Sequence, residues 1–270
     1  MKLCFFHLMP YQDLPDNFEK DYHSVWVDAP NSLFDPEKGH RMYNDFLDEL
    51  EYAEAMGFDA ICVNEHHGNA YGMMPSPNLM ASAMIRATSK AAVVVLGNSL
   101  ALYNPPVRVA EEMAMLDVMS GGRLIAGFPL GTSMDTIFGY GQVPATLREK
   151  YQEAHDLVIK AWKEREPFAF NGKFTQLRYV NIWPRPYQQP HPPVWVTMGS
   201  AGSAAQVAQR RHVGGVFLAG YPKIRSIFDG YRKGYLDAHG SDAPIDRLAY
   251  CALIHAVSYT HLTLPTNREV

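Results

Sequence analysis

Three adjacent residues with titratable side chains, Glu65, His66 and His67, directly follow the short apolar run Ala60–Val63. Carboxylates and imidazoles are the groups that exchange protons near neutral pH, so this segment could carry general acid–base chemistry. A lone histidine at the end of a strand often does no more than hydrogen-bond a loop. Three titratable groups together favour a functional site over that structural role.

A metal centre is the alternative for this segment. Metal ligands must converge on one point, whereas neighbouring residues on a strand point to opposite faces of the sheet. The His-x-His pair of metal-dependent barrel hydrolases would place two imidazoles on one face, and no such pair occurs in this sequence. The spacing therefore favours a metal-free acid/base histidine, with metal-dependent hydrolysis as the weaker hypothesis.

A second segment with possible chemistry, Gly199–Ser203, is expected to be the turn between a strand and a helix. The start of a helix presents unpaired backbone N–H groups and the positive end of the helix dipole, which together bind phosphate. Ser200 and Ser203 could add hydroxyl donors. Alternatively, either serine only caps the helix that follows.

Short apolar runs that alternate with helix-patterned segments are expected to position these residues. The runs are continuous rather than alternating with polar residues, which is typical of strands in a parallel sheet that is covered on both faces. We predict strands at Leu3–Leu8, Ala60–Val63, Ala92–Leu96, Leu124–Phe128, Val194–Met198, Gly215–Leu218 and Leu248–Val257. We predict helices around residues 46–57, 105–122, 151–162, 204–211 and 224–235, and a hairpin that turns at Asn171-Gly172.

This order of elements predicts an α/β fold, a (β/α)8 barrel with an insertion between its fourth and fifth strands. A doubly wound sheet would need Gly-x-Gly-x-x-Gly after an early strand, and the sequence has none. Active sites of parallel barrels lie at the carboxyl ends of the strands. Asn98 and Ser99, after the third strand, and Leu130, after the fourth, therefore join the candidate site residues.

The last segment, residues 258–270, has neither a strand nor a helix period, and the sequence supplies seven strand candidates where a closed barrel needs eight. It resembles the translated read-through of a sequencing adapter. We expect residues 1–257 to form one incomplete barrel domain that lacks strand eight and the last helix. Residues 258–270 would then be a non-native tail, and a genuine disordered tail is the alternative.

The bulk composition is that of an ordinary globular protein, with 47% hydrophobic and 19% charged residues. A net charge of −4 gives no reason to expect nucleic acid or a membrane surface as a partner. The first apolar run is too short for a signal peptide, and no stretch approaches the roughly 20 apolar residues of a membrane span. We therefore expect a cytoplasmic location.

Several segments together resemble the bacterial luciferase-like flavin-dependent monooxygenase family, in order from Lys2 to about Val257. The segments are Gly57-Phe58-Asp59, Glu65-His66-His67, Pro106-Val107-Arg108-Val109-Ala110-Glu111-Glu112, Ser120-Gly121-Gly122-Arg123, Gly127-x-x-x-Gly131, Phe170-Asn171-Gly172-x-Phe174 and Trp183-Pro184-Arg185-Pro186-Tyr187-Gln188. Each segment is short, but their combination and order are specific.

The resemblance implies an enzyme that uses reduced FMN and O2 to oxidise a small organic substrate. A separate flavin reductase would supply the reduced FMN, and the enzyme would be a homodimer. By the same match His66 is the catalytic acid/base, Glu65 lines the flavin ring, and a strained peptide in the Ser99-Leu100 region lies against it. Gly199, Ser200 and Ser203 match the phosphate-binding turn.

One residue departs from the family's pattern. In the luciferase subunit an arginine after the fourth strand contacts the flavin phosphate, and Leu130 stands at the matching position here. The choice between FMN and a deazaflavin therefore stays open, with a deazaflavin-dependent oxidoreductase as one alternative. A non-catalytic flavin-binding partner subunit is the other. Apolar residues are expected to form a lid that excludes water: Met73, Met74, Phe128, Phe138 and Tyr140.

Overall fold

The structure is a computed structural model that describes residues 1–254. The chain divides into two compact units, one of which is Met1–Val196 and the other of which begins at Thr197. The prediction that residues 258–270 are a non-native tail falls outside the described residues. Among the described residues, no helix is both long and apolar enough to cross a membrane.

The first unit is built on parallel strands that follow one another in chain order. The strands are β1 (Cys4–Phe6), β2 (Ala60–Val63), β3 (Ala92–Val95), β4 (Leu124–Gly127) and β7 (Val194–Thr197). Each pairs in parallel with the next, with registers that include Phe6↔Cys62, Val63↔Val95, Val95↔Ala126 and Gly127↔Trp195. All their carboxyl ends therefore lie at one edge of the sheet.

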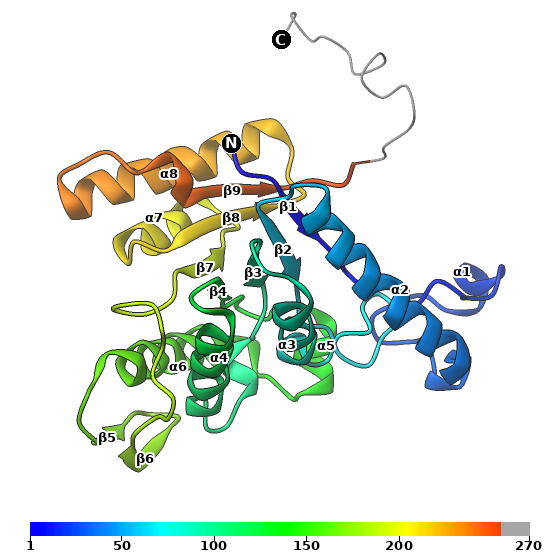
Figure 1. Cartoon of the computed structure of the whole chain (residues 1–270), viewed down its shortest axis with the longest axis horizontal. Coiled ribbons are helices and arrows are strands. Elements are labelled where there is room, and N and C mark those ends of the chain that lie inside the picture. The colour runs from blue at the N-terminus through cyan, green and yellow to red at the C-terminus, as the bar shows by residue number, and fades with distance from the viewer. Residues whose placement is uncertain (255–270) are drawn as a thin grey trace, which may run out of the picture. The chain divides into compact units, whose positions relative to one another are not determined.

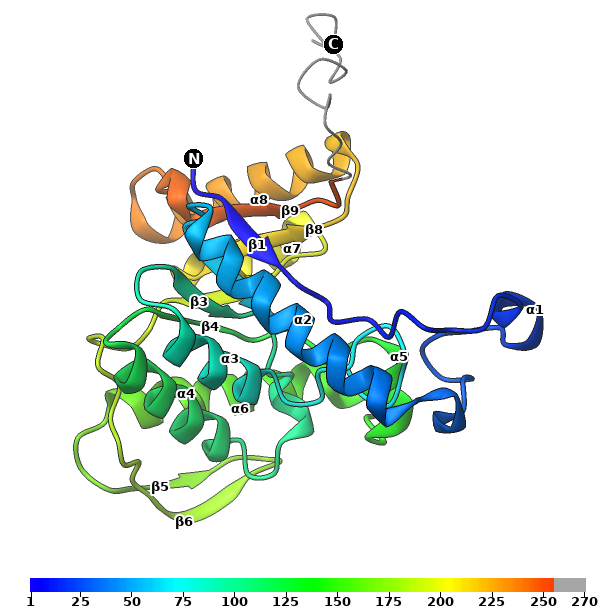
Figure 2. The same ribbon diagram turned by 45° about the vertical axis from the view of Figure 1, so that its right-hand side comes forward.

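Helices connect these strands, and α2, α3 and α4 lie side by side along the sheet (Figures 1 and 2). The helices of this unit are α1 (Phe18–Asp21), α2 (Pro36–Ala55), α3 (Pro77–Ala87), α4 (Val107–Ser120), α5 (Met134–Gly139) and α6 (Pro144–Lys163), with 3-10 turns η1 (Asn31–Leu33) and η2 (Leu100–Leu102). Asp35 caps α2 by accepting bonds from two amides of its first turn. Gly121, with φ at +65°, ends α4 in the left-handed region that favours glycine.

The core of the first unit lies between the sheet and these helices. Its largest fully buried side chains include Trp162 of α6 and Phe128, whose ring centroids lie 5.8 Å apart. The indole N–H of Trp162 donates to the carbonyl of Ala110 at 2.9 Å, so the one polar atom of this ring is satisfied. Gly127 brings β4 close to β3, because a Cβ there would lie 2.2 Å from the carbonyl oxygen of Val95.

The insertion between β4 and β7 contains an antiparallel hairpin of β5 (Phe168–Asn171) and β6 (Gln176–Val180). The Glu153 carboxylate of α6 accepts bonds from three consecutive amides of its turn, those of Lys173, Phe174 and Thr175. One carboxylate of α6 therefore anchors the turn that was predicted at Asn171-Gly172.

The second unit contains α7 (Ala201–Gln209), β8 (Val213–Phe217), α8 (Tyr221–His239), η3 (Ile245–Arg247) and β9 (Leu248–Cys251). Strands β8 and β9 pair in parallel, and α8 connects them. Gly230 and Gly234 allow α8 to lie directly on α7, since a Cβ at either position would come within 2.7 Å of an alanine on that helix.

The seven predicted strands are confirmed to within a few residues at their ends, except that the last is shorter than predicted. It ends at Cys251, residues 252–254 are not in a strand, and its predicted end at Val257 lies outside the described residues. The five predicted helices and the hairpin are confirmed as well. Helices α1, α3 and α5 were not predicted, and α2 begins at Pro36, well before the predicted helix around residues 46–57.

Candidate functional site

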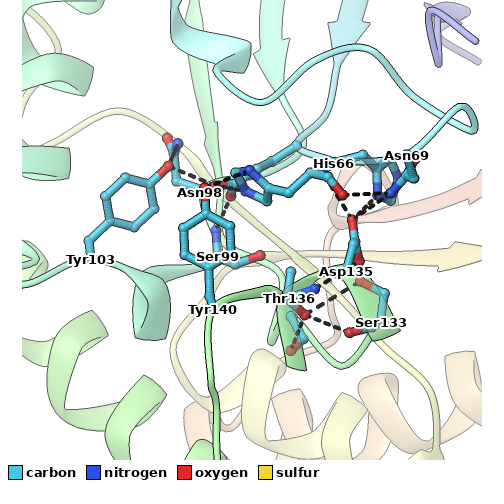
Figure 3. A network of polar contacts seen from close by, with 12 residues as sticks. His66, Asn69, Asn98, Ser99, Tyr103, Ser133, Asp135, Thr136 and Tyr140 are labelled. Carbon is cyan, nitrogen blue, oxygen red and sulfur yellow. Dashed lines mark hydrogen bonds and ion pairs between the residues drawn. The ribbon is translucent and has the colours of Figure 1, made fainter. Parts of the chain in front are cut away.

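The carboxyl ends of β2 and β3 bring four of the predicted site residues together (Figure 3). Glu65 and His66 follow β2, and Asn98 and Ser99 follow β3. The amide of Ser99 donates to Oε2 of Glu65 at 2.7 Å, which ties the two strand ends to each other. Gly97 permits this approach, because a Cβ there would lie 2.9 Å from the Glu65 nitrogen.

His66 is held by a carboxylate that the sequence analysis missed. Its Nδ1 lies 3.0 Å from Oδ2 of Asp135, which stands at the start of α5. The same oxygen accepts the amide of His67 at 3.0 Å and the side-chain amide of Asn69 at 3.3 Å. One oxygen atom thus orients the imidazole and fixes the backbone that carries it.

The Asp135 carboxylate is ionised at neutral pH. Its side chain is fully buried, and burial alone would raise the pKa of Asp135. Hydrogen bonds from the His66 and Ser133 side chains and from a backbone amide outweigh burial and hold this pKa below its ordinary value. An ionised acceptor requires a proton on Nδ1 of His66, which leaves Nε2 as the working nitrogen.

Aromatic rings surround His66 on the opposite side. The ring of Trp26 lies 5.0 Å from the imidazole and that of Tyr71 lies 5.1 Å away, both edge-on. The two aromatic rings stack on each other at 4.3 Å. The His66 side chain is 13% exposed, so the imidazole keeps a small contact with solvent.

Glu65 already has internal partners for both of its carboxylate oxygens. Besides the Ser99 amide, it accepts the Tyr103 hydroxyl at 2.9 Å and faces Nε2 of His67 at 2.8 Å. Burial and the Glu65 carboxylate raise the pKa of Tyr103, so this phenol keeps its proton and donates it. The side chain of Glu65 therefore supports the other residues of the site.

Asn98 is the best candidate among these residues for contact with a ligand. Its side-chain nitrogen donates to the Tyr103 oxygen at 2.9 Å. Its Oδ1 is buried and has no hydrogen-bond partner among the described residues. A buried amide oxygen without a partner costs free energy unless a bound molecule supplies a donor. An isoalloxazine ring carries such an N–H group, so the site fits a flavin.

Ser99 packs against the glycine that follows β4. Gly131 has φ at +72°, and a Cβ there would lie 2.9 Å from that of Ser99. The neighbouring Leu130 is half-buried and packs against the core. The cis peptides among residues 1–254 all precede prolines, so the strained peptide that the resemblance implies in the Ser99-Leu100 region is not a cis bond.

In the second unit, Gly199–Ser203 forms the predicted turn into α7. Ser200 and Ser203 make a reciprocal capping box, in which Ser200 Oγ accepts the Ser203 amide at 3.2 Å. Ser203 Oγ accepts the amides of Gly199 at 3.3 Å and Ser200 at 3.1 Å. Both serines therefore have the capping role, and the predicted phosphate site at this turn stays a prediction.

The residues expected to form a lid are divided between the core and the surface. Phe128 and Met74 are fully buried in the core of the first unit, and Met73 is nearly so, whereas the side chains of Phe138 and Tyr140 are exposed. Tyr140, which caps the end of α5, reaches back into the site, where its hydroxyl lies 3.0 Å from Nδ1 of His67. The described residues contain no group of three or more potential ligands placed to hold a metal ion.

Comparison of the sequence with models of protein families indicates the family of this chain. The model for luciferase-like monooxygenases matches residues 25–258, which is most of the chain. The chain belongs to the luciferase-like monooxygenase family. The family predicted from the sequence is thereby confirmed, and the parallel strands with helices between them agree with the predicted barrel fold.

Curated relatives of this luciferase-like chain include known oxygenases. It is 29% identical over 167 residues to the oxygenase component of a flavin-dependent trigonelline monooxygenase from Acinetobacter baylyi, a match that covers 60% of this chain and 45% of the relative. It is 28% identical to the alkanal monooxygenase alpha chain of the Kryptophanaron alfredi symbiont, over 77% of this chain and 56% of the relative. The chain thus spans about half the length of these relatives.

Solved structures share the fold of this luciferase-like chain. Monooxygenase RslO1 from Streptomyces bottropensis superposes with a TM-score of 0.76 at 22% identity, over 93% of this chain and 70% of that one. The oxygenating constituent of 3,6-diketocamphane monooxygenase from Pseudomonas putida, in complex with FMN, gives 0.75 at 17% identity, over 93% and 66%. An F420-dependent secondary alcohol dehydrogenase gives 0.68 at 18% identity, over 92% and 67%.

Proposed function

We propose that this luciferase-like chain is the oxygenase component of a flavin-dependent monooxygenase that uses reduced FMN and O2 to oxidise a small organic substrate. The observation that carries this proposal is the His66–Asp135 pair at the carboxyl end of β2. It leaves Nε2 of the imidazole without a hydrogen-bond partner among residues 1–254. A protonated Nδ1 and an available Nε2 make His66 suited to general acid–base catalysis.

The flavin, when bound, would supply the electrons that activate O2. Asn98 would hold it by accepting a ring N–H at Oδ1, and Glu65 and Ser99 would fix the position of Asn98 through Tyr103 and the strand ends. Gly199, Ser200 and Ser203 would receive its phosphate, with Leu130 in place of the family's arginine. This assignment rests on the resemblance and on the unpaired oxygen of Asn98.

The residues of this chain would manage protons and water around that chemistry. Asp135 holds the His66 imidazole in one tautomer, so that Nε2 can give or take a proton at the mouth of the site. Trp26 and Tyr71 screen the same imidazole from solvent. Exclusion of water prevents side reactions of reactive intermediates, such as their hydrolysis.

The remaining elements of the proposal rest on the resemblance to the family and on one relative. The Acinetobacter baylyi relative is an oxygenase component, so a separate flavin reductase is proposed as the partner here. A homodimer, a cytoplasmic location and one incomplete barrel domain over residues 1–257 complete the proposal.

A deazaflavin-dependent oxidoreductase is the second candidate function. The F420-dependent alcohol dehydrogenase shares the fold, and Leu130 removes the cation that would favour the FMN phosphate. The two candidates are separated by titrating the protein with FMN and with F420 and then assaying O2 consumption with each reduced cofactor. Binding and O2 consumption with FMN support the monooxygenase, whereas binding of F420 alone supports the second candidate.

A His66→Ala variant tests whether the site is catalytic. We expect it to bind FMN and to lose activity by about 10²-fold or more, the usual contribution of a general acid–base residue. His40→Ala, which removes an exposed histidine of α2, is the matched control and should retain full activity. Unchanged activity in His66→Ala would support a non-catalytic flavin-binding subunit instead.

A further inference from the structure

Tyr140, which is labelled in Figure 3, forms with His67 and Glu65 a hydrogen-bonded series that is separate from the His66–Asp135 pair. The Tyr140 hydroxyl lies 3.0 Å from Nδ1 of His67, and Nε2 of the same ring lies 2.8 Å from Oε1 of Glu65. The histidine and glutamate side chains are buried, with 9% and 1% of their surfaces exposed. The tyrosine is 48% exposed. The series therefore joins a buried carboxylate to a solvent-facing phenol.

The direction of each hydrogen bond in this series follows from the partners of Glu65, the buried end of the series. The Asn98 side-chain nitrogen can only donate, so the Tyr103 oxygen accepts from it and donates its own proton to Glu65. The Ser99 amide also donates to Glu65, so both carboxylate oxygens act as acceptors. His67 must then donate to Glu65 from Nε2, which leaves Nδ1 to accept the proton of Tyr140.

A hydroxyl, an imidazole and a carboxylate in this order are the groups of the Ser-His-Asp triad, with a phenol in place of the serine hydroxyl. In such a series the hydroxyl can pass its proton inward while it takes another from a bound molecule. Tyr140 is the one half-exposed residue of the three, so a bound molecule would reach the series at this residue. Each nitrogen of the His67 ring has a hydrogen-bond partner, so the imidazole is held in the orientation that this transfer needs.

We propose that Tyr140, backed by His67 and Glu65, takes a proton from an acidic hydroxyl group, phenolic or enolic, of the organic substrate. The substrate O–H bond breaks as a bond forms to the Tyr140 oxygen, and the proton that Tyr140 held moves to Nδ1 of His67. The products are a substrate oxyanion and an imidazolium held by the Glu65 carboxylate, with no change in oxidation state. This assignment deepens the proposed function and rests on it, because it names the substrate class of the same site.

The probe that tests this assignment is 4-nitrophenol, whose absorbance reports its own ionisation. Titrated with the flavin-free protein at the pH where the free probe is half-ionised, the bound probe should be shifted towards nitrophenolate. Tyr140→Phe should bind the probe about tenfold more weakly and leave its ionisation unshifted. His67→Gln should also abolish the shift. Tyr52→Phe, which removes an exposed phenol hydroxyl of α2, should behave as the wild type does.

The wild-type titration alone can overturn the assignment. The assignment of Tyr140 is wrong if the wild type binds no probe at millimolar concentration, or binds the probe without a shift towards nitrophenolate. An unaltered shift in Tyr140→Phe would also contradict it. Flavin titration of the same proteins separates this result from the proposed function. A wild type that binds FMN without ionising the probe refutes the substrate assignment alone, and one that ionises the probe without binding flavin refutes the monooxygenase alone.

Discussion

Oδ2 of Asp135 lies 3.0 Å from Nδ1 of His66, although the two residues are 69 positions apart in the chain. The same oxygen accepts the amide of the next residue, His67. The carboxylate therefore fixes the imidazole, its tautomer and its backbone together.

Replacing Asp135 by Asn keeps the His66 side chain but removes the carboxylate that orients it, so this variant tests whether that orientation is needed for activity. The amide is similar in size, but it lacks the charge that keeps the proton on Nδ1 of the imidazole. We expect turnover with reduced FMN to fall by about 10²-fold or more, while the dissociation constant for FMN stays within about twofold. Steady-state O2 consumption and a fluorescence titration measure the two quantities. Loss of FMN binding in parallel with activity would contradict the role given to Asp135.

Asp135 should also make the stability of the protein depend on pH. Its pKa is lowered in the folded state, so its contribution to the free energy of unfolding is fully present above its ordinary value of 3.8. The contribution is lost as the pH falls below that value towards the folded-state pKa. The difference in unfolding free energy between wild type and Asp135→Asn should therefore shrink from about pH 5 to about pH 3. Urea denaturation across this range measures it, and a difference that grows would refute the lowered pKa.

Gly131 should be needed for the stability of the fold for two reasons: Ser99 lies close to it, and its backbone has a positive φ. Gly131→Ala places a methyl group 2.9 Å from the Ser99 Cβ at a residue with φ of +72°. Gly141→Ala is the matched control, since Gly141 has φ of +59° and open space around it. We expect the control to cost about 1 kcal/mol and Gly131→Ala to cost about 1–3 kcal/mol more. Equal losses in chemical denaturation would show that the Ser99 contact is relaxed at no cost.

Glu153 should hold the turn of the inserted hairpin. Glu153→Ala leaves the amides of Lys173, Phe174 and Thr175 without their acceptor. Water can replace the acceptor at the exposed Lys173 amide, but the Phe174 and Thr175 amides are partly buried, and an unmet buried hydrogen bond costs about 1–3 kcal/mol. We expect these amides to exchange hydrogen markedly faster than in the wild type. Glu149→Ala, which removes an exposed ion pair with the Lys173 side chain, should change exchange little. Similar exchange in both variants would contradict the anchoring role.

The sheet could be predicted from the sequence because its strands are short, continuous apolar runs such as Ala60–Val63, which is buried at every position. Helix α4 was equally clear, since prolines precede it and Gly121 ends it. Helix α3 was missed. Its buried face combines Asn78 and Ala81 with larger side chains, so its helical period is weak.

The candidate site was predictable only where its residues directly follow strands. Glu65 and His66 are adjacent to β2, and Asn98 and Ser99 are adjacent to β3, so the barrel hypothesis placed them at one edge. Asp135 and Tyr140 come from α5 and its end, and no local pattern relates either residue to the histidines. A carboxylate shortly after the fourth strand was the available signal for Asp135.

The most direct test of the central claim is the reoxidation of reduced FMN by O2, followed by stopped-flow absorbance with wild type and His66→Gln. We predict that saturating wild-type protein changes the time course from that of free reduced FMN. His66→Gln should bind reduced FMN within about twofold of the wild type but change the rate of the protein-dependent phase by about 10²-fold. A time course that matches free reduced FMN at saturating wild-type protein, or one identical in wild type and His66→Gln, would contradict the claim that this imidazole serves a bound flavin.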